Sequence, residues 1–182
     1  MDYPNLLSEI TSIKPGEVIA IDGPAGSGKT TLANQLKSDI PEIEIIHVDD
    51  LYQGWQDAFS QRLTNSVIDQ ILNPISQKLD FKYEIYDWKN NTFHKSHIVP
   101  ANKVYVLDGV TSGQSQFRPY LSKIIWLNIS DDIGLTRVLN RDGEEILSPM
   151  REFQEAQKLH FARELTENAA DFTYEGVPKT LL

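Results

Sequence analysis

The sequence predicts an α/β fold in which a parallel β-sheet is flanked by helices. Short apolar runs alternate with segments of helical periodicity, which is typical of a parallel sheet covered on both faces. The chain has 182 residues, of which 40% are hydrophobic and 24% charged. That length suffices for one α/β domain with a substantial core and is short for two. We therefore expect a single domain that spans residues 1–182.

Strands are expected where short apolar runs are bounded by polar or turn-forming residues. An apolar run without strict alternation is typical of a strand that is buried on both faces. The expected strands are Glu17–Asp22, Glu42–Val48, Lys103–Asp108, Lys123–Ile129 and Asp171–Tyr174.

Helices are expected between these strands, where apolar residues recur every three or four positions. The expected ranges are 31–38, 66–79 and 131–141, followed by a long helix with its cap and first turn at Ser148–Pro149. Within the second range, Asn73–Pro74 should break or kink the helix, because proline lacks a backbone N–H. Residues at helical spacing in the last helix should face the core, namely Met150, Phe153, Ala156 and Leu159.

Two segments do not fit the alternation and are candidate substrate-handling insertions. Residues 81–100 (FKYEIYDWKNNTFHKSHIVP) are expected to form a β-hairpin that turns at Asn90–Asn91. Residues 141–149 (RDGEEILSP) are expected to form a polar loop between two helices, short enough to act as a small lid.

The residues IDGPAGSGKT (21–30) combine three glycines with a lysine and a threonine directly after the first expected strand. Glycines there allow successive N–H groups to converge on one anion at a helix N-terminus. Lys29 adds a charge for the outer phosphates, and the Thr30 hydroxyl is a ligand for the Mg²⁺ that accompanies ATP. The pattern is the P-loop motif G-x-x-x-x-G-K-T. The residues expected to bind ATP are Gly23, Ala25, Gly26, Ser27, Gly28, Lys29, Thr30 and Thr31.

Residues beyond this motif favour a phosphotransferase. A guanine-reading N-K-x-D motif is missing, since Asn102–Lys103 is followed by VY. Gly109 follows Asp108, where hydrolytic motors commonly place a glutamate that activates water. Asp108 ends a central strand, where ligand sites of parallel sheets gather, and with Thr30 it is the expected Mg²⁺ contact.

A pair of carboxylates, Asp49 and Asp50, closes the second expected strand within HVDDLY. A carboxylate beside the P-loop strand can accept the proton of an acceptor hydroxyl. Asp49 is the expected base; a helix cap or turn pair is the structural alternative, and Asp50 could equally be the residue on the metal side.

Aromatic and basic residues supply further candidates. Tyr52, Trp55, Tyr86 and Trp88 could stack a planar acceptor or fill the core. Arg137 and Arg141 lie four residues apart on one helical face, where they could clamp a phosphate across a closed lid or remain solvated near the helix end. Arg151 is a third candidate for the clamp.

The net charge of −9 disfavours binding to the negatively charged backbone of nucleic acid. A small anion is the expected partner instead. No apolar segment reaches the length of about 18 residues that indicates a membrane span. The first residues, MDYPNLLSEI, lack a basic leader, and the chain has no cysteine. We therefore expect a cytoplasmic location without membrane contact.

The motifs GPAGSGKTT, HVDDLY, YDW, VLDGV and LTRVLNRDG together resemble the P-loop nucleoside kinases of the uridine kinase and phosphoribulokinase group. The resemblance extends from about Val18 to Gly176. It implies a three-layer P-loop fold with a five-stranded parallel core, and ATP- and Mg²⁺-dependent transfer of the γ-phosphate to a hydroxyl of a small nucleoside-like acceptor.

By motif position, the resemblance also implies roles for single residues. Asp49 stands at the catalytic aspartate, and Tyr86 at a substrate-contacting tyrosine of the hairpin. Asp108 stands where uridine kinases usually carry glutamate. Arg137 and Arg141 resemble the arginines around the mobile lid of this family, and Arg137 is also expected to bind ATP. The expected catalytic residues are Asp49, Lys29 and Arg141, and the expected acceptor contacts are Asp49, Tyr52 and Tyr86.

The chain departs from the family pattern at three places. GWQDAF stands near the position of the F-D-H-P segment, Asn91 replaces the hairpin histidine, and RDGEE replaces an arginine-rich lid turn. Two alternatives to a nucleoside kinase therefore stay open. One is a regulatory or accessory protein that binds ATP without phosphotransfer, and the other is a kinase for a sugar or a vitamin.

Overall fold

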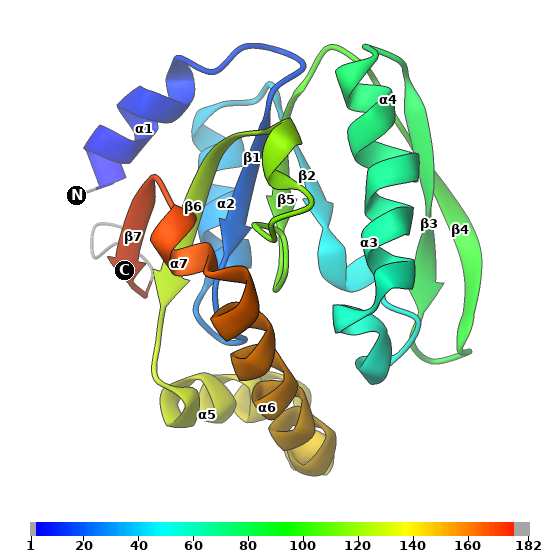
Figure 1. Ribbon diagram of the computed structural model, residues 1–182, viewed down its shortest axis with the longest axis vertical. Coiled ribbons are helices and arrows are strands. Elements are labelled where there is room, and N and C mark those ends of the chain that lie inside the picture. Colours follow the sequence, from blue (N-terminus) through cyan, green and yellow to red (C-terminus); the bar gives the residue numbers. More distant parts are fainter. Residues whose placement is uncertain (1–2, 177–182) are drawn as a thin grey trace.

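A five-stranded parallel sheet forms the centre of the protein, as the sequence predicted (Figure 1). The structure is a computed structural model that describes residues 3–176 and, for residues 94–96, the backbone alone. The strands are β1 (Val18–Asp22), β2 (Ile43–His47), β5 (Val104–Asp108), β6 (Leu121–Asn128) and β7 (Phe172–Glu175), in the order β2-β5-β1-β6-β7. Every residue of β1 and β5 is buried, which explains their unbroken apolar pattern.

Helices cover both faces of this sheet. They are α1 (Tyr3–Thr11), α2 (Lys29–Asp39), α3 (Gln61–Val67), α4 (Asn73–Ser76), α5 (Asp131–Asp142), α6 (Leu147–Glu164) and α7 (Thr166–Ala169). In Figure 1, α2 lies behind the sheet, α6 and α7 lie in front, and α3 and α4 stand beside the hairpin. Alternate strand residues face two separate cores: Ile19 and Val106 pack in the core with α1 and α2, whereas Tyr105 and Leu107 pack in the core with α3 and α6.

The helix that contains Asn73–Pro74 does not break at the proline, but an irregular turn precedes it, where the sequence predicted a break or a kink. A π-helical turn, η3 (Ile68–Leu72), joins α3 to α4. In this turn the Asn73 N–H donates to Ile68 O, five residues back. Pro74 then falls in the first turn of α4, where the missing N–H costs little. The helix also begins at Gln61, five residues earlier than the periodicity indicated, with Ser60 as its N-cap.

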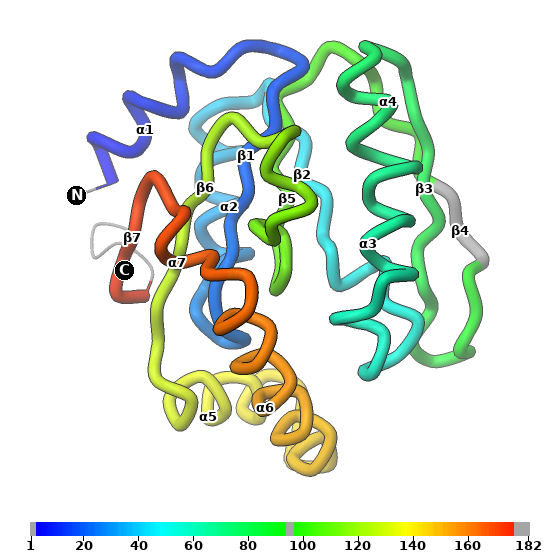
Figure 2. The backbone as a smooth tube through the Cα atoms, in the orientation of Figure 1, coloured from blue at the N-terminus to red at the C-terminus, as the bar shows by residue number. Residues whose placement is uncertain are grey.

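The predicted hairpin is present as β3 (Phe81–Asp87) and β4 (Thr92–Val99), which form a separate antiparallel sheet. Asp87 accepts hydrogen bonds from the backbone N–H groups of Lys89 and Asn90, and Asn91 has a positive φ of 52°. The turn is therefore where the sequence predicted it. The tube in Figure 2 shows the hairpin beside α3 and α4, far from α1 and β7.

The core face of α6 was predicted in part only. Met150 and Phe153 are buried, but Leu159 is 75% exposed. A strict spacing of three residues rotates by about 60° per step around a helix with 3.6 residues per turn, so its fourth member leaves the buried face. Polar residues occupy that face instead, namely Gln154, Gln157, His160 and Glu164. The helix begins at Leu147 with Ile146 as its N-cap, so Ser148 does not cap it.

Two short helices were not predicted. α1 buries Tyr3, Leu6 and Ile10 against the core that contains α2. α7 follows Leu165, which has a left-handed φ of 50° and separates it from α6. Among residues 3–176, no helix has the length and apolar character needed to cross a membrane.

Candidate functional site

The P-loop joins β1 to α2 at the carboxyl edge of the sheet. Gly28 is the N-cap of α2 and has a left-handed φ of 96°. A Cβ at Gly23, whose φ is 139°, would lie 2.2 Å from Leu127 O. Only glycine fits at position 23, because this strand-to-loop turn runs directly against β6. The N–H groups of the first turn of α2 consequently face the space above the sheet, as a phosphate site requires.

Lys29 is buried and holds the loop that surrounds it. Its Nζ donates to Gly23 O and Pro24 O, each at 2.9 Å. Burial lowers the pKa of Lys29, while the carboxylates of Asp49 and Asp108 favour its charged form. A cation that is poorly solvated and surrounded by acidic groups is well placed to bind an anionic phosphate.

Asp108 ends β5 and forms the acidic centre of the site. Its Oδ2 accepts hydrogen bonds from Thr30 Oγ1 at 2.9 Å and shares a contact of 2.8 Å with His47 Nδ1. Its Oδ1 is buried and has no hydrogen-bond partner. A buried carboxylate oxygen without a partner, next to a threonine hydroxyl at a P-loop, suits Mg²⁺. Thr30 and Asp108 therefore fit the metal role that the sequence assigned to them.

Asp49 lies in the 3₁₀ turn η1 (Val48–Leu51), at the carboxyl end of β2. Its carboxyl group opens onto a cavity, and its Oδ1 lies 3.3 Å from where a Cβ at Gly109 would be. Asp49 is exposed at the cavity wall, and the surrounding protein raises its pKa chiefly by desolvation; the charge of Lys29 opposes this shift and that of Asp108 adds to it. A carboxylate with a raised pKa is a better proton acceptor. Asp50, its neighbour, does not line the cavity.

The cavity has a volume of about 980 Å³, and its lining combines two chemically different groups of residues. The first group is polar and charged, from the P-loop and α5, and includes Lys29, Thr30, Arg137 and Arg141. The second group is apolar and aromatic, and ring contacts connect Tyr52, Trp55, Trp88 and Phe153 within it. We call this second group the aromatic subsite and define it by Tyr52, Trp55, Trp88, Val110, Met150 and Phe153. Asp49 also lines this cavity.

The basic residues expected in the lid differ in where they lie. Arg137 and Arg141 both line the cavity from α5. Arg137 donates to Gly26 O at 3.2 Å, and Arg141 donates to both carboxylate oxygens of Asp142, at 2.7 and 2.6 Å. Arg151 is exposed and lies outside the cavity lining. The lid itself is one 3₁₀ turn, η5 (Glu144–Ile146).

Tyr86 does not line the cavity, in contrast to the contact that the resemblance implied. Its ring is buried against Trp88 and Phe93, and its hydroxyl donates to Asn91 Oδ1 at 3.1 Å. Tyr86 thus supports Trp88, which does reach the cavity. The hairpin therefore contributes this tryptophan, and not the tyrosine, to the cavity lining.

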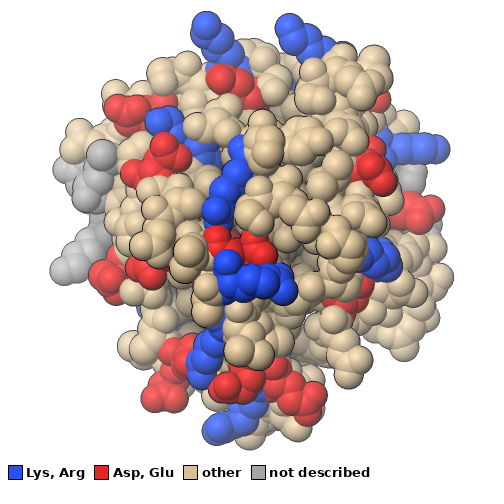
Figure 3. Space-filling model, in the orientation of Figure 1, with Lys and Arg blue, Asp and Glu red and all other residues tan. Residues whose placement is uncertain are grey.

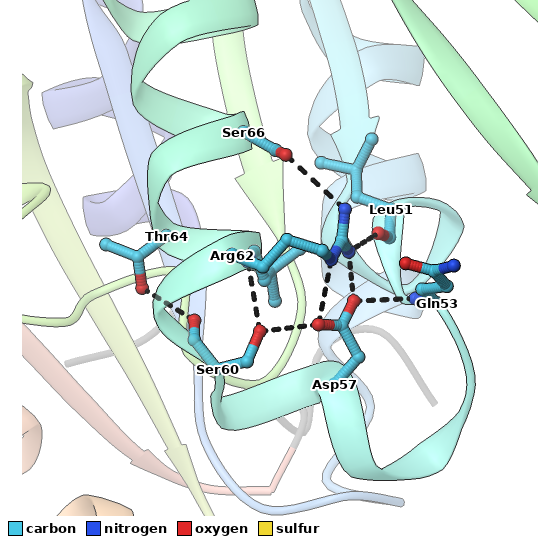
Figure 4. Close-up of polar contacts among 8 residues, drawn as sticks. Leu51, Gln53, Asp57, Ser60, Arg62, Thr64 and Ser66 are labelled. Atoms are coloured by element: carbon cyan, nitrogen blue, oxygen red, sulfur yellow. Dashed lines mark hydrogen bonds and ion pairs between the residues drawn. The ribbon is translucent and has the colours of Figure 1, made fainter.

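The segment GWQDAF contributes Trp55 to the aromatic subsite, and Figure 4 shows the polar contacts that hold it around Asp57. Asp57 accepts from Gln53 N at 2.7 Å, from Ser60 Oγ at 2.5 Å and from the guanidinium of Arg62. Arg62 also donates to Leu51 O at 2.8 Å. This network ties the 3₁₀ turn η2 (Trp55–Phe59) to both η1 and α3 and thereby fixes Trp55.

Two residues that support the P-loop were missed in the sequence. Asp22 is fully buried and accepts from the N–H groups of Gly23, Thr111 and Gly113, at 2.7, 3.1 and 2.9 Å. Burial raises its pKa to about 6 against these hydrogen bonds. Gln157 of α6 accepts from Ala25 N at 2.9 Å. In the sequence, no pattern distinguishes Asp22 from other aspartates at strand ends, or Gln157 from other polar residues of a surface helix.

Acidic and basic side chains are mixed on the face shown in Figure 3, and no broad basic area covers the residues coloured there. Among the described side chains of residues 3–93 and 97–176, no group of three or more His, Asp or Glu is placed to hold a metal by itself. The Mg²⁺ expected at Thr30 and Asp108 would therefore depend on phosphate oxygens as further ligands. The absence of a nucleic-acid partner stays a prediction.

A parallel sheet with a glycine-lined loop, a buried lysine and a helix N-terminus at its carboxyl edge defines a P-loop nucleotide-binding protein. The family model described as AAA domain matches residues 19–160. The chain belongs to this AAA domain family.

Similar proteins confirm the resemblance that the motifs indicated. The chain is 26% identical over 145 residues to uridine kinase of Lactobacillus johnsonii, and the match covers 70% of this chain and 68% of that protein. It is 27% identical over 149 residues to uridine kinase of Lactobacillus helveticus, with the same coverage. A possible uridine kinase from Bacillus stearothermophilus has the same fold, with a TM-score of 0.72 at 20% identity over 94% of this chain and 96% of that one. Shikimate kinase from Acinetobacter baumannii also shares the fold, with a TM-score of 0.57 at 14% identity over 96% and 90%.

Proposed function

We propose that this protein is an ATP-dependent kinase that transfers the γ-phosphate to a hydroxyl of a small, nucleoside-like acceptor. One observation carries the proposal: Asp49 lines the same cavity as the P-loop lysine and threonine and the aromatic subsite. A carboxylate between a phosphate site and a pocket for a second molecule fits group transfer. The uridine kinases among the similar proteins support the same reaction class.

The P-loop would bind ATP through the N–H groups of Gly26, Gly28 and Thr30 and through the charge of Lys29. Mg²⁺, held by Thr30 and Asp108, would neutralise charge on the phosphate oxygens. Arg137 and Arg141 would face the transferred group from α5. Since the transition state of phosphoryl transfer is loose, these positive charges contribute mainly by positioning and neutralisation.

In the transfer step, the acceptor oxygen forms a bond to the γ-phosphorus and its proton passes to Asp49. The bond from that phosphorus to the β–γ bridging oxygen breaks, and ADP leaves. The raised pKa of Asp49 favours acceptance of the proton. Gly109, which follows Asp108, leaves no carboxylate at the place where a hydrolytic motor activates water.

ADP production from ATP and Mg²⁺ tests the proposal, measured with and without a panel of nucleosides, pentose derivatives and vitamin alcohols. We expect one acceptor class to stimulate turnover, and Lys29→Ala to abolish both ATP binding and stimulation. Arg151→Ala, outside the cavity, is the matched loss of a positive charge and should behave like the unmodified chain. Tight ATP binding without stimulation by any acceptor would contradict the proposal and favour an ATP-binding regulatory protein.

A further inference from the structure

We propose that Asp22 is a positioning residue that holds Asp49 in place for the transfer step, through the loop that follows β5. We call residues 109–114 the β5 loop. This inference rests on the proposed function, because it gives Asp22 a part in a reaction whose base is Asp49. Asp22 itself touches neither ATP nor the acceptor in this scheme, since it is fully buried and does not line the cavity.

Asp22 joins the start of the P-loop to the β5 loop. Its Oδ1 accepts from the N–H groups of Gly23 and Thr111, at 2.7 and 3.1 Å. Its Oδ2 accepts from the N–H of Gly113 at 2.9 Å. Residues 109–114 are all buried, so water cannot replace a partner that these N–H groups lose. One carboxylate thus holds two segments that lie far apart in the sequence.

Thr111 shows that the β5 loop needs such contacts to keep its shape. Its φ is 82°, in the left-handed region that β-branched residues rarely adopt. A conformation of this kind persists only where the surrounding structure enforces it. Asp22 binds the N–H of Thr111 itself, and Ile21 O accepts from the hydroxyl of Ser112 at 2.9 Å. Loss of the carboxylate should therefore let the β5 loop relax.

The β5 loop packs in turn against the segment that carries Asp49. Gly109 lies so close to η1 that a Cβ there would be 2.8 Å from Val48 Cβ and 3.3 Å from Asp49 Oδ1. Val110 O accepts from the hydroxyl of Tyr52 at 3.1 Å, directly after η1. Because η1 follows the end of β2, hydrogen bonds of the sheet do not hold it. Its contacts with the β5 loop therefore help to fix where Asp49 lies relative to the P-loop.

A small displacement of Asp49 matters, because a base accepts a proton only within hydrogen-bond distance of the hydroxyl that loses it. Asp22→Asn is the mildest change that tests the connection. An asparagine has one carbonyl oxygen, and its NH₂ group would face either the N–H of Gly113 or those of Gly23 and Thr111. At least one buried N–H then has no acceptor, and its segment is released.

Hydrogen exchange measured by mass spectrometry tests this connection without an acceptor. In Asp22→Asn, the amides of residues 47–54 should exchange about tenfold faster or more, although the hydrogen bonds of Asp22 go to other segments. Residues 3–11 should exchange as in the unmodified chain. Asp171→Asn is the matched control, because Asp171 also accepts from a backbone N–H, that of Ile124 at 2.8 Å, and lies outside the cavity lining.

Gly113→Ala disturbs the same contact while the carboxylate stays, and it carries the test if Asp22→Asn does not fold. A Cβ at position 113 would lie 2.7 Å from Thr166 Cγ2 and 3.3 Å from Asp22 Oδ2. The β5 loop would have to shift, so residues 47–54 should again exchange faster. Unchanged exchange of these residues in both variants would overturn the inference, and so would an equal increase along the whole chain.

Turnover with uridine as the acceptor probe shows whether the connection serves catalysis. Asp22→Asn should lower kcat by about tenfold or more and change KM for ATP by less than about twofold. In the Asp49→Asn background, the same change should cost about twofold or less, because no base is left to misplace. Losses that multiply in the double variant would overturn the inference. So would a kcat of Asp22→Asn that equals that of Asp171→Asn.

The two measurements separate this inference from the proposed function. If no acceptor of the panel raises ADP production but residues 47–54 exchange faster in both variants, the kinase proposal fails and the placement of Asp49 by Asp22 stands. If the unmodified chain phosphorylates uridine and Asp22→Asn keeps its kcat, the kinase proposal stands and the inference fails.

Discussion

The hydroxyl of Thr30 donates to Oδ2 of Asp108 over 2.9 Å, which joins the first turn of α2 to the end of β5. His47 contacts the same oxygen from β2 at 2.8 Å, and this bond is the main cause that raises the pKa of His47. Both partners hold Oδ2, while the buried Oδ1 has none. The carboxylate is thus oriented by protein on one oxygen and open for a cation on the other.

Asp108→Asn is expected to raise the Mg²⁺ concentration for half-maximal turnover by about tenfold or more, because asparagine keeps the shape but not the charge. The measurement is ADP production against Mg²⁺ at saturating ATP. Asp132→Asn removes an exposed carboxylate from α5 and serves as the matched control. An identical Mg²⁺ dependence in the two variants would rule out a metal role for Asp108.

Asp49→Asn is expected to reduce kcat by about 10²-fold or more while ATP affinity changes little, since proton acceptance contributes to the chemical step. Asp50→Asn is the matched comparison, because Asp50 is the next residue but lies outside the cavity lining. Rapid turnover in the Asp49 variant, or equal losses of kcat and ATP affinity, would contradict the role of a base.

The raised pKa of Asp49 also has a consequence for the pH profile. The base must be ionised to act, so kcat should rise with pH as Asp49 loses its proton. The midpoint of this rise should lie above the usual range for aspartate, which is about 4. A rise that is complete below that value would show that Asp49 is not desolvated in the complex.

The parallel sheet and its ends could be predicted from the sequence for a simple physical reason. Strands such as β1 and β5 are buried on both faces, so their apolar runs are unbroken and easy to locate. The P-loop follows because its glycines are required by close contacts such as that of Gly23 with Leu127. The hairpin was also predicted correctly, because its turn is formed by neighbouring residues such as Asp87 and Asn90.

The aromatic lining of the cavity was harder to predict, because tertiary contacts decide which side chains reach it. Trp88 and Tyr86 lie two residues apart in one hairpin, yet only Trp88 lines the cavity. Gln157 looks like a surface residue until α6 packs against the P-loop. Leu159 was misjudged because residues spaced three apart move around a helix and leave its buried face. At Pro74 the helix does not break, because a π turn accommodates the proline.

Gly134→Ala is expected to weaken ATP binding, although alanine normally stabilises a helix interior by about 1 kcal/mol over glycine. Gly134 lies in α5 directly against the P-loop, and a Cβ there would be 2.5 Å from Ala25 O. Relief of this clash must move α5 away from the loop, at a cost of roughly 1–3 kcal/mol in the free energy of unfolding.

Titration calorimetry with ADP and denaturant unfolding would measure both effects. Thr136→Ala, at an exposed position two residues further along α5, controls for helix propensity. If Gly134→Ala stabilised the protein and left ADP affinity intact, neither stability nor nucleotide binding would require close packing of α5 on the P-loop.

His160→Phe is expected to reduce the loss of stability on acidification between pH 7 and pH 5. His160 is 3% exposed between Phe59 and Phe161, with ring centroids 5.3 and 5.7 Å away. Arg163 donates to its Nδ1 at 3.2 Å, which places the proton of the neutral ring on Nε2, a buried atom without a partner. Burial lowers its pKa from 6.5 to about 4.

The sign of the effect follows from the two protonation states. Between the folded and unfolded pKa values, the unfolded chain binds a proton that the folded chain does not, so the free energy of unfolding falls as pH falls. The contribution of His160 over this range is roughly 2 kcal/mol. Asp22, whose pKa is raised to about 6, contributes the opposite slope, and only the difference between the variant and the unmodified chain isolates His160.

Urea unfolding at pH 7, 6 and 5 measures that difference, and phenylalanine preserves the ring contacts with Phe59 and Phe161. Glu164, whose pKa is lowered to about 2, affects stability only below this range, because its unfolded carboxyl titrates near 4.5. A pH dependence that is the same with histidine and with phenylalanine at position 160 would mean that His160 becomes charged without unfolding. Water would then reach the buried polar face of α6, formed by Gln154, Gln157, His160 and Glu164.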